Sequence, residues 1–322
     1  MKSFKYLLTA VAAVIAFASC TQKDNCKPGT PVVFGVSTAG NEVPVTKAEY
    51  SGMVVEGYER INWELDDRIS IYSMQPGIPE GDNRGAEYKI SSTPVVDGRY
   101  SKARIAPAGN SWLIWGEGPF PAFYAIYPKI TAPGSQKVHV FESHMMQSGS
   151  ILEFKAMIPR SQELESEPLM YAQTTVDDKV NPVNLDFKPA VNTFDIELKN
   201  GRSTPINLRS VGLQSSSASL SGRFDITLSL GGGGNATYYL MDPNYRDVKR
   251  AYADGLTIGY LESKTVRIYT IPEDINDLTL ILEETNGRIS KLELRYNDEW
   301  IRFAKEGKYG LKGLEIPPVT TP

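Results

Sequence analysis

The hexapeptide Phe194-Asp195-Ile196-Glu197-Leu198-Lys199 alternates apolar and charged side chains with a period of two. In an extended strand, successive side chains point to opposite faces, so the three apolar residues share one face and the three charged residues share the other. The hexapeptide therefore predicts a β-strand with one buried face. Working outward, the same alternation returns at residues 220–230, 266–269, 292–295 and 301–303. In the first half of the chain, residues 32–36, 69–72 and 123–127 are rich in β-branched and aromatic residues and also predict strands.

Turn-forming dipeptides separate these segments. Asp-Gly and Asn-Gly pairs, which can supply the positive-φ residues of tight hairpins, occur at residues 97–98, 200–201, 254–255 and 286–287. The best candidates for short helices are residues 246–253 and 272–277. Strands with one buried face, joined by tight turns, predict an all-β fold, and we expect two antiparallel β-sandwich domains in tandem after a leader and a short tether.

The composition narrows the classes of function. The chain has 322 residues, of which 41% are hydrophobic and 22% charged, so it can bury a sizeable core. A formal net charge of −4 without any basic stripe argues against a nucleic-acid partner. Two cysteines can form at most one disulfide bond, which excludes a disulfide-stabilised scaffold for a chain of this length. With only two histidines, metal or catalytic sites built from histidine are disfavoured.

The sequence also lacks the motifs of familiar enzyme sites. G-x-S-x-G, H-E-x-x-H, the phosphate-binding G-x-x-x-x-G-K-[ST] and the EF-hand loop are all absent. His139 and His144 are five residues apart, which places them on opposite faces of a strand. We therefore expect no enzymatic activity, no metal and no cofactor.

The first residues have the pattern of an export signal. Lys2 and Lys5 precede an apolar run at residues 6–17, which is too short to span a bilayer, and Ala18-Ser19-Cys20 follows it. This order resembles a bacterial lipobox and predicts a lipoprotein signal peptide over residues 1–19 with lipidation at Cys20. An ordinary signal peptide with an incidental Cys20 is the alternative. Residues 20–30, which include Cys26, are expected to form a flexible tether, and the role of Cys26 is left open.

Two acidic stretches that end in proline suggest a domain boundary. They are SQELESEP (residues 161–168) and VDDKVNP (residues 176–182). Such composition suits a crossing between domains. We expect an N-terminal sandwich over residues 31–178 and a C-terminal sandwich over residues 179–322.

An aromatic cluster lies in the first half of the chain. In a β-sandwich such residues usually fill the core, and the neighbouring prolines predict an edge strand; a carbohydrate-stacking surface is the alternative. The cluster comprises Trp112, Trp115, Phe120, Phe123, Tyr124 and Tyr127.

Several segments, in their order along the chain, resemble fimbrillin-type proteins of Bacteroidales bacteria. INWELDDRISIY (residues 61–72) resembles their W-x-x-x-D-x-I-x-V strand, and FPAFYAIYP (residues 120–128) resembles their YYAIYP strand. The further segments are PLMYAQTT (168–175), VNLDFKPAVNTFDIEL (183–198), INLRSVGLQSSSASLSGRFDI (206–226) and WIRFAKEGKYGLKGLEI (300–316). The chain departs from the family at Pro189, where a histidine is frequent, and a proline there predicts a bulge or an edge.

The resemblance implies a structural or adhesive fimbrial subunit, displayed at the cell surface as an outer-membrane lipoprotein. In related major pilins, an Arg- or Lys-directed protease removes the N-terminal strand, and an extended segment of another subunit fills the groove by β-augmentation. The removable strand here would contain Val32, Val33, Phe34 and Val36, and Lys47 is the candidate processing site.

The donor strand implied by the resemblance would lie at the C-terminus, with Leu311, Leu314 and Ile316. After Ile316 the chain reads PPVTTP, whose three prolines make a poor donor, so a tip, anchor or accessory role stays open beside a shaft role. The implied partners are other fimbrial subunits, outer-membrane lipid through the acyl anchor, and a host protein or glycan. The alternative function is a surface lipoprotein that binds glycans through Trp112, Trp115 and Trp300.

Overall fold

The computed structural model describes residues 26–38, 49–50, 53–56, 62–75, 85–97, 100–130, 139–145, 151–162, 168–229, 235–296 and 298–316. Within these ranges every regular element is a β-strand, which confirms the all-β prediction. Both predictions of short helices are wrong: β18 (Asp247–Ile258) is a twelve-residue strand, and residues 272–277 are not helical. β18 pairs with β15 (Ile206–Gln214), and this non-local pairing outweighs a weak local pattern.

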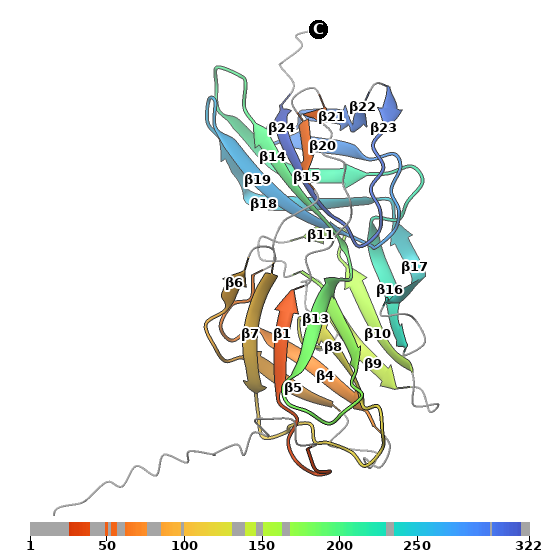
Figure 1. Cartoon of the computed structure of the whole chain (residues 1–322). Coiled ribbons are helices and arrows are strands. Elements are labelled where there is room, and N and C mark those ends of the chain that lie inside the picture. Colours follow the sequence, from red (N-terminus) through yellow and green to blue (C-terminus); the bar gives the residue numbers. More distant parts are fainter. Residues whose placement is uncertain are drawn as a thin grey trace, which may run out of the picture.

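One group of strands forms a barrel-like sheet, seen in the lower part of Figure 1. Its order is β1 (Phe34–Thr38), β13 (Val183–Pro189), β12 (Met170–Thr175), β8 (Ala122–Tyr127), β4 (Arg68–Met74), β5 (Gly85–Ile90), β7 (Tyr100–Pro107) and β6 (Val95–Asp97). β1 also pairs with β7, so seven strands close into a ring. Because this ring closes, the structure does not confirm two tandem sandwiches.

The other strands form the sheets in the upper and right-hand parts of Figure 1. One sheet has the order β17 (Thr237–Tyr245), β16 (Ser221–Ser229), β10 (Ile151–Ile158) and β9 (His139–Met145). A second has the order β11 (Ser161–Gln162), β18, β15, β20 (Thr279–Glu284) and β21 (Ile289–Glu293). A third has the order β19 (Ser263–Thr270), β14 (Asn192–Lys199), β24 (Lys308–Glu315), β3 (Met53–Glu56) and β2 (Glu49–Tyr50), and β22 (Arg295–Tyr296) pairs separately with β23 (Glu299–Trp300).

The sheets do not divide at the expected boundary between residues 178 and 179. β12 and β13 flank that position and pair with each other in the barrel. β10 precedes the position, yet it pairs with β16 in the other group. The chain also leaves the barrel after β1, adds β3 to β24, and returns to the barrel at β4. Position along the sequence therefore does not assign a strand to its sheet.

Two hydrophobic clusters meet at β8, whose six residues are all buried. Phe123, Ala125 and Tyr127 belong to the cluster inside the barrel. The alternate residues Tyr124 and Ile126 belong to the larger cluster, which continues into the other sheets. β8 pairs with β4 and β12, so the prediction of an edge strand is wrong; Pro121 and Pro128 lie just outside it, where no ladder hydrogen bond is lost.

The residues that follow position 25 lie against the barrel. The Cys26 N–H donates to Lys179 O at 2.5 Å, and the Gly29 N–H donates to Trp115 O at 2.8 Å. The Cys26 side chain is buried in the barrel cluster. The prediction of a flexible tether is therefore wrong for residues 26–30, because backbone hydrogen bonds and burial fix them. No helix in the described ranges is long and apolar enough to cross a membrane.

Candidate strand-exchange site

The predicted removable strand is present as β1, preceded by Val32 and Val33. Val32, Phe34 and Val36 are all less than 5% exposed, and they contribute to the barrel cluster. Val33, Gly35 and Ser37 alternate with them and are half-buried on the outer side. This period of two follows from the strand pleat, which places alternate side chains of VVFGV inside the barrel.

Phe34 is the central apolar contact of β1. Its ring meets Tyr88 edge-on at 5.3 Å between centroids and Phe123 edge-on at 5.2 Å. The Tyr88 hydroxyl accepts the Leu113 N–H at 2.9 Å, and burial raises the pKa of this phenol well above its usual range. Phe34 thus fills an aromatic pocket inside the barrel, and its loss would leave a cavity there.

β1 is hydrogen-bonded along both edges. It runs parallel to β13 over all five residues of Phe34–Thr38, but antiparallel to β7 only over Gly35–Ser37. At its start, the Val33 N–H donates to Asn181 Oδ1 at 2.9 Å, and the Val183 N–H donates to Val33 O at 2.8 Å. If β1 left the barrel, it would expose two strand edges and the apolar slot between them.

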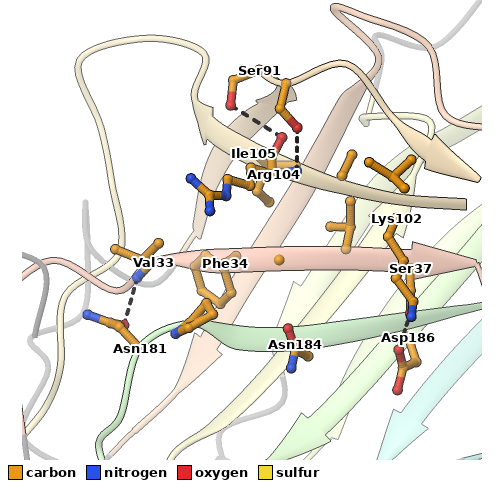
Figure 2. Close-up of a pocket in the computed structure, with 16 residues that line it drawn as sticks. Val33, Phe34, Ser37, Ser91, Lys102, Arg104, Ile105, Asn181, Asn184 and Asp186 are labelled. Carbon is orange, nitrogen blue, oxygen red and sulfur yellow. Dashed lines mark hydrogen bonds between the residues drawn. The ribbon is translucent and has the colours of Figure 1, made fainter. Parts of the chain in front are cut away.

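A groove of about 930 Å³ lies along β1. Figure 2 shows the residues that line it. Its walls combine apolar and charged groups, including Val95 and Ile105 together with Lys102 and Arg104 of β7. The facing wall comes from β13 and the segment that enters it: Asn181, Asn184 and Asp186.

Two side chains of β13, those of Asp186 and Asn184, lie beside β1 in this groove. The Ser37 hydroxyl donates to Asp186 Oδ1. Gly35 lies opposite Asn184, and a Cβ atom at position 35 would lie 2.9 Å from Asn184 Oδ1. A side chain larger than hydrogen at position 35 would therefore require Asn184 to move.

The predicted donor residues lie in or directly after β24. Leu311, Leu314 and Ile316 are buried. β24 runs parallel to β14 and pairs with β3 over only three residues, Gly310–Lys312. The Ile316 N–H donates to Lys199 O at 3.0 Å. β24 is thus an integrated strand of its own sheet, and it must detach before it can serve another subunit.

The N-terminal end of β24 is fastened by aromatic packing. The ring of Tyr309 stacks on Phe194 at 5.3 Å and meets Phe303 edge-on at 5.0 Å. Its hydroxyl donates to Ala304 O at 2.6 Å, and burial raises its pKa well above the usual value. The adjacent Lys308 is buried, and burial together with the charge of Arg267 lowers its pKa to about 8.

A carboxylate just before β24 connects this strand to the barrel. The Tyr238 hydroxyl donates to Glu306 Oε1 at 2.5 Å, and the Tyr171 hydroxyl of β12 lies 3.5 Å from the same oxygen. Burial, and then the charge of Glu306, raises the pKa of Tyr171 to about 12. Burial, and then the same charge, also raise the pKa of Tyr238 well above its usual range, so both phenols keep their protons at neutral pH.

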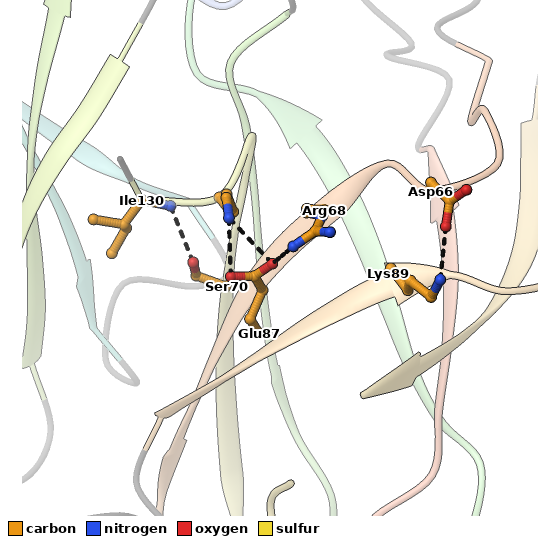
Figure 3. A network of polar contacts seen from close by, with 7 residues as sticks. Asp66, Arg68, Ser70, Glu87, Lys89 and Ile130 are labelled. Carbon is orange, nitrogen blue, oxygen red and sulfur yellow. Dashed lines mark hydrogen bonds and ion pairs between the residues drawn. The ribbon is translucent and has the colours of Figure 1, made fainter. Parts of the chain in front are cut away.

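Charged pairs stabilise the wall formed by β4 and β5, away from β1 (Figure 3). Glu87 accepts hydrogen bonds from Arg68 at 2.6 Å and from Lys129 at 3.1 Å. Burial alone would raise the pKa of Glu87, but these two cations outweigh it and lower the pKa. Lys89 bonds Asp66 at 2.7 Å, and this hydrogen bond lowers the pKa of Asp66. None of these groups belongs to β1, so its departure would leave them in place.

The three tryptophans of the glycan-binding alternative have different environments. Trp115 is fully buried, as expected if the aromatic cluster fills the core, so it cannot serve the glycan-binding alternative. Trp300 is half-buried, with the Arg295 guanidinium 4.3 Å above its ring. Trp112 is 46% exposed and lines a mostly apolar cavity of about 240 Å³ that also touches Phe34 and Tyr88.

Several predicted features stay untested. Cys20 and Lys47 lie outside the described residues. No cluster of metal-ligating side chains occurs in the part of the chain that the structure describes.

The sequence pattern did not indicate Asn181, Asn184 and Asp186 as residues of this groove. Polar residues in or beside a strand resemble ordinary solvated positions. Their only signal in the sequence was their place in or beside the VNLDF segment.

No protein-family model matches the chain, and no curated protein matches it. Among solved structures, a protein provisionally described as a cell adhesion protein from Bacteroides uniformis shares 14% identity at a TM-score of 0.47, covering 88% of this chain and 97% of that chain. A similarly described protein from Bacteroides ovatus shares 14% identity at a TM-score of 0.43, covering 92% of this chain and 100% of that chain.

A third solved structure is a fimbrial assembly protein from Parabacteroides distasonis. It shares 6% identity at a TM-score of 0.31, covering 81% of this chain and 98% of that chain. At these identities and TM-scores, the likeness assigns no function to this chain.

Proposed function

We propose that this chain is a structural or adhesive subunit of a bacterial fimbria that assembles by β-strand exchange, and that it has no enzymatic role. The observation that carries the proposal is the position of β1. It is a five-residue strand near the start of the described residues, with Phe34 and Val36 in the barrel cluster, and it closes a ring through only three residue pairs with β7. Its removal would create an apolar slot with two unsatisfied strand edges, which a strand of another subunit could fill.

Processing and anchoring complete the proposal. Lipidation at Cys20 would hold the unprocessed subunit at the outer membrane, and cleavage at Lys47 would separate β1 from the rest of the chain. Position 47 lies between β1 and β2, so a cut there leaves β3 joined to the rest of the chain, where it pairs with β24. Such a cut would free the strand without dividing either group of sheets.

The pairing of β24 bears on the position in a fimbria. Because β24 is bonded on both sides, donation requires a conformational change as well as processing. A subunit at the tip, at the anchor or in an accessory position needs only to accept a strand or only to donate one, so it can avoid this conformational change. A shaft subunit must both accept and donate a strand.

Glycan binding at a surface lipoprotein is the second candidate. Trp112 supports it, because its half-exposed ring borders the cavity of about 240 Å³. Binding on a glycan array that is lost in Trp112→Ala, but retained in Trp300→Ala, would favour this function. Silence of the folded protein across a broad array would remove it.

Proteolytic processing gives the primary test. The native surface protein should show an acylated Cys20 before processing and a new N-terminus after Lys47, by mass analysis and N-terminal sequencing. Lys47→Ala should block both processing and SDS-resistant oligomers, whereas the exposed control Lys305→Ala should not. A processed protein that stays monomeric under all assembly conditions would contradict strand exchange.

A further inference from the structure

Gly35 lies in the middle of β1, where a glycine weakens the strand. Such a glycine often marks a bulge, a tight bend or a place that a ligand or another backbone approaches closely. β1 pairs with β13 and with β7 without a register shift at Gly35, and Gly35 is not among the glycines with positive φ. The conformation of the backbone therefore does not require a glycine at this position.

The space beside Gly35 belongs to the groove of about 930 Å³. Among the described residues, and leaving out the neighbours of Gly35 in the chain, only Asn184 Oδ1 lies within 4 Å of the place that a Cβ atom at position 35 would take. The groove thus reaches the backbone of β1, and a ligand in it can approach the strand itself.

Arg104 of β7 and Asn184 of β13 flank Gly35 in one row across the three strands. Figure 2 shows both residues on the strands that lie on either side of β1. The spacing of neighbouring strands separates their Cα atoms by about 10 Å. The row therefore has a polar side chain at each end and bare backbone in its middle.

The Arg104 guanidinium makes no hydrogen bond or ion pair with any residue that the structure describes, whereas the guanidinium of Arg68 pairs with Glu87. A guanidinium is always charged, and its planar fork matches the geometry of a carboxylate. The charged residues that line the groove are Lys102, Arg104 and Asp186, so two cations face one carboxylate. This balance favours an anionic ligand.

The wall beside Arg104 adds two hydroxyl groups. Ser92 Oγ accepts the Arg104 N–H at 2.9 Å, so its own proton is available to another acceptor. Ser91 Oγ donates to Arg104 O at 3.2 Å, so its lone pairs can accept. Across the groove, the amide of Asn184 offers both kinds of group. These mixed donors and acceptors complement the hydroxyls of a sugar, and the exposed Val95 offers an apolar contact for its C–H groups.

From these contacts we propose that the groove binds a saccharide that carries a carboxylate, with the acid group on Arg104 and the sugar ring over Gly35. A peptide strand fits less well, because β1 uses both of its edges in the ring and leaves none for strand addition. The site does not depend on strand exchange, since the closed ring forms it, and it is separate from the cavity beside Trp112.

A saccharide bound in this groove would contact three strands of the ring at once. Its groups would meet β7 and β13 on either side of β1, so it would bind the closed ring and not the opened one. Such a ligand stabilises the closed state by mass action. At a concentration ten times its Kd, it should slow amide exchange at residues 35–37 by about tenfold.

The test uses the full chain and a panel of carboxylated sugars, namely short oligomers of galacturonic acid, of mannuronic acid and of sialic acid. Calorimetry should detect binding of at least one of them. The methyl ester of that oligomer, which is neutral and nearly the same size, should bind more weakly by about tenfold or more. Arg104→Gln should cause a loss of the same order, and Gly35→Ala, which places a methyl group on the floor, should also weaken binding.

Two variants serve as controls. Arg302→Gln removes an exposed arginine in another part of the fold, and Trp112→Ala changes the other candidate glycan site. Both should bind the acidic oligomer as the wild-type chain does. Binding that is lost in Trp112→Ala and kept in Arg104→Gln would overturn the groove as the site.

The remaining outcomes each decide one part of the proposal. Absence of binding to every member of the panel overturns it. Equal binding of the methyl ester overturns the role of the carboxylate, and binding of an oligoglutamate peptide as tightly as the sugar overturns the class of ligand. Unchanged amide exchange at residues 35–37 in the complex overturns the placement over β1. None of these results bears on strand exchange.

Discussion

The side-chain oxygen Oδ1 of Asn181 accepts the backbone N–H of Val33 at 2.9 Å, across 148 positions of sequence. Asn181 also donates through Nδ2 to Pro31 O at 3.3 Å. One side chain at the entry of β13 thus holds the backbone on both sides of Val32. The start of β1 is fixed by a residue that belongs to the opposite side of the expected domain boundary.

Asn181→Ala should loosen the start of β1. It leaves the Val33 N–H without this acceptor, and the loss of such a bond costs about 1–2 kcal/mol. Hydrogen exchange by mass spectrometry should show faster exchange at residues 32–34. Asn181→Asp keeps an acceptor and should have a smaller effect. Asn276→Ala, an exposed position in another part of the fold, serves as the control, and equal exchange in all variants would contradict the role of Asn181.

Phe34→Ala should destabilise the barrel strongly. It leaves a cavity beside Tyr88 and Phe123, and truncations of buried phenylalanine cost about 3–5 kcal/mol. The free energy of unfolding, measured in urea, should fall by that order. Tyr239→Ala removes an aromatic ring that is 72% exposed and should change stability little. A similar fall in both variants would mean that the ring of Phe34 is not a central core contact.

Tyr238→Phe should accelerate the opening of β24. It removes the hydroxyl that donates to Glu306 at 2.5 Å, and a hydrogen bond to a charged group contributes about 1.5–3 kcal/mol. Amide exchange in residues 308–312 should speed up by about tenfold or more. The matched control is Tyr239→Phe on the next residue of the same strand. Unchanged exchange in Tyr238→Phe would show that Glu306 does not hold β24.

Asp277 should contribute to acid sensitivity. Burial tends to raise its pKa, but hydrogen bonds from the hydroxyls of Ser215, Ser216 and Ser217 and from the Ser216 N–H outweigh burial and lower the pKa to about 2. The ordinary value is 3.8, so the folded state favours the ionised form. The resulting stability is present above pH 4 and is lost as the pH falls toward about 2.

Urea unfolding at pH 5 and at about pH 2.5 measures this contribution. Asp277→Asn should lower the stability at pH 5 and reduce the further loss at low pH. Asp298→Asn, at an exposed position, is the control. An identical pH dependence in Asp277→Asn and the wild-type chain would assign the acid sensitivity to other carboxylates.

Part of the site could be read from local pattern alone. The β-branched and aromatic residues of VVFGV predict a strand, and residues 34–36 lie in β1. The strand pleat then places alternate residues on one face, and Val32, Phe34 and Val36 are the buried set. Both steps depend only on the local chain.

Other features depend on neighbours that are distant in sequence. The prolines at positions 121 and 128 suggested an edge strand, yet β8 lies between β4 and β12 because both prolines fall outside its ladder. The polarity of residues 20–30 suggested a tether, yet Cys26 is buried because Lys179 and the barrel cluster meet it. Neither contact leaves a signal in the local sequence.

The sequence by itself determined that the chain is all-β and which face of most strands is apolar, because the period of two is set by the geometry of one extended strand. The tertiary structure alone decided which strands become neighbours. β1 closes the ring by pairing with β7, β10 of the first half of the chain pairs with β16 of the second half, and Gly35 lies opposite Asn184. Pairing depends on loop closure and on the fit of distant surfaces, and a periodic pattern specifies a face without specifying the partner that covers it.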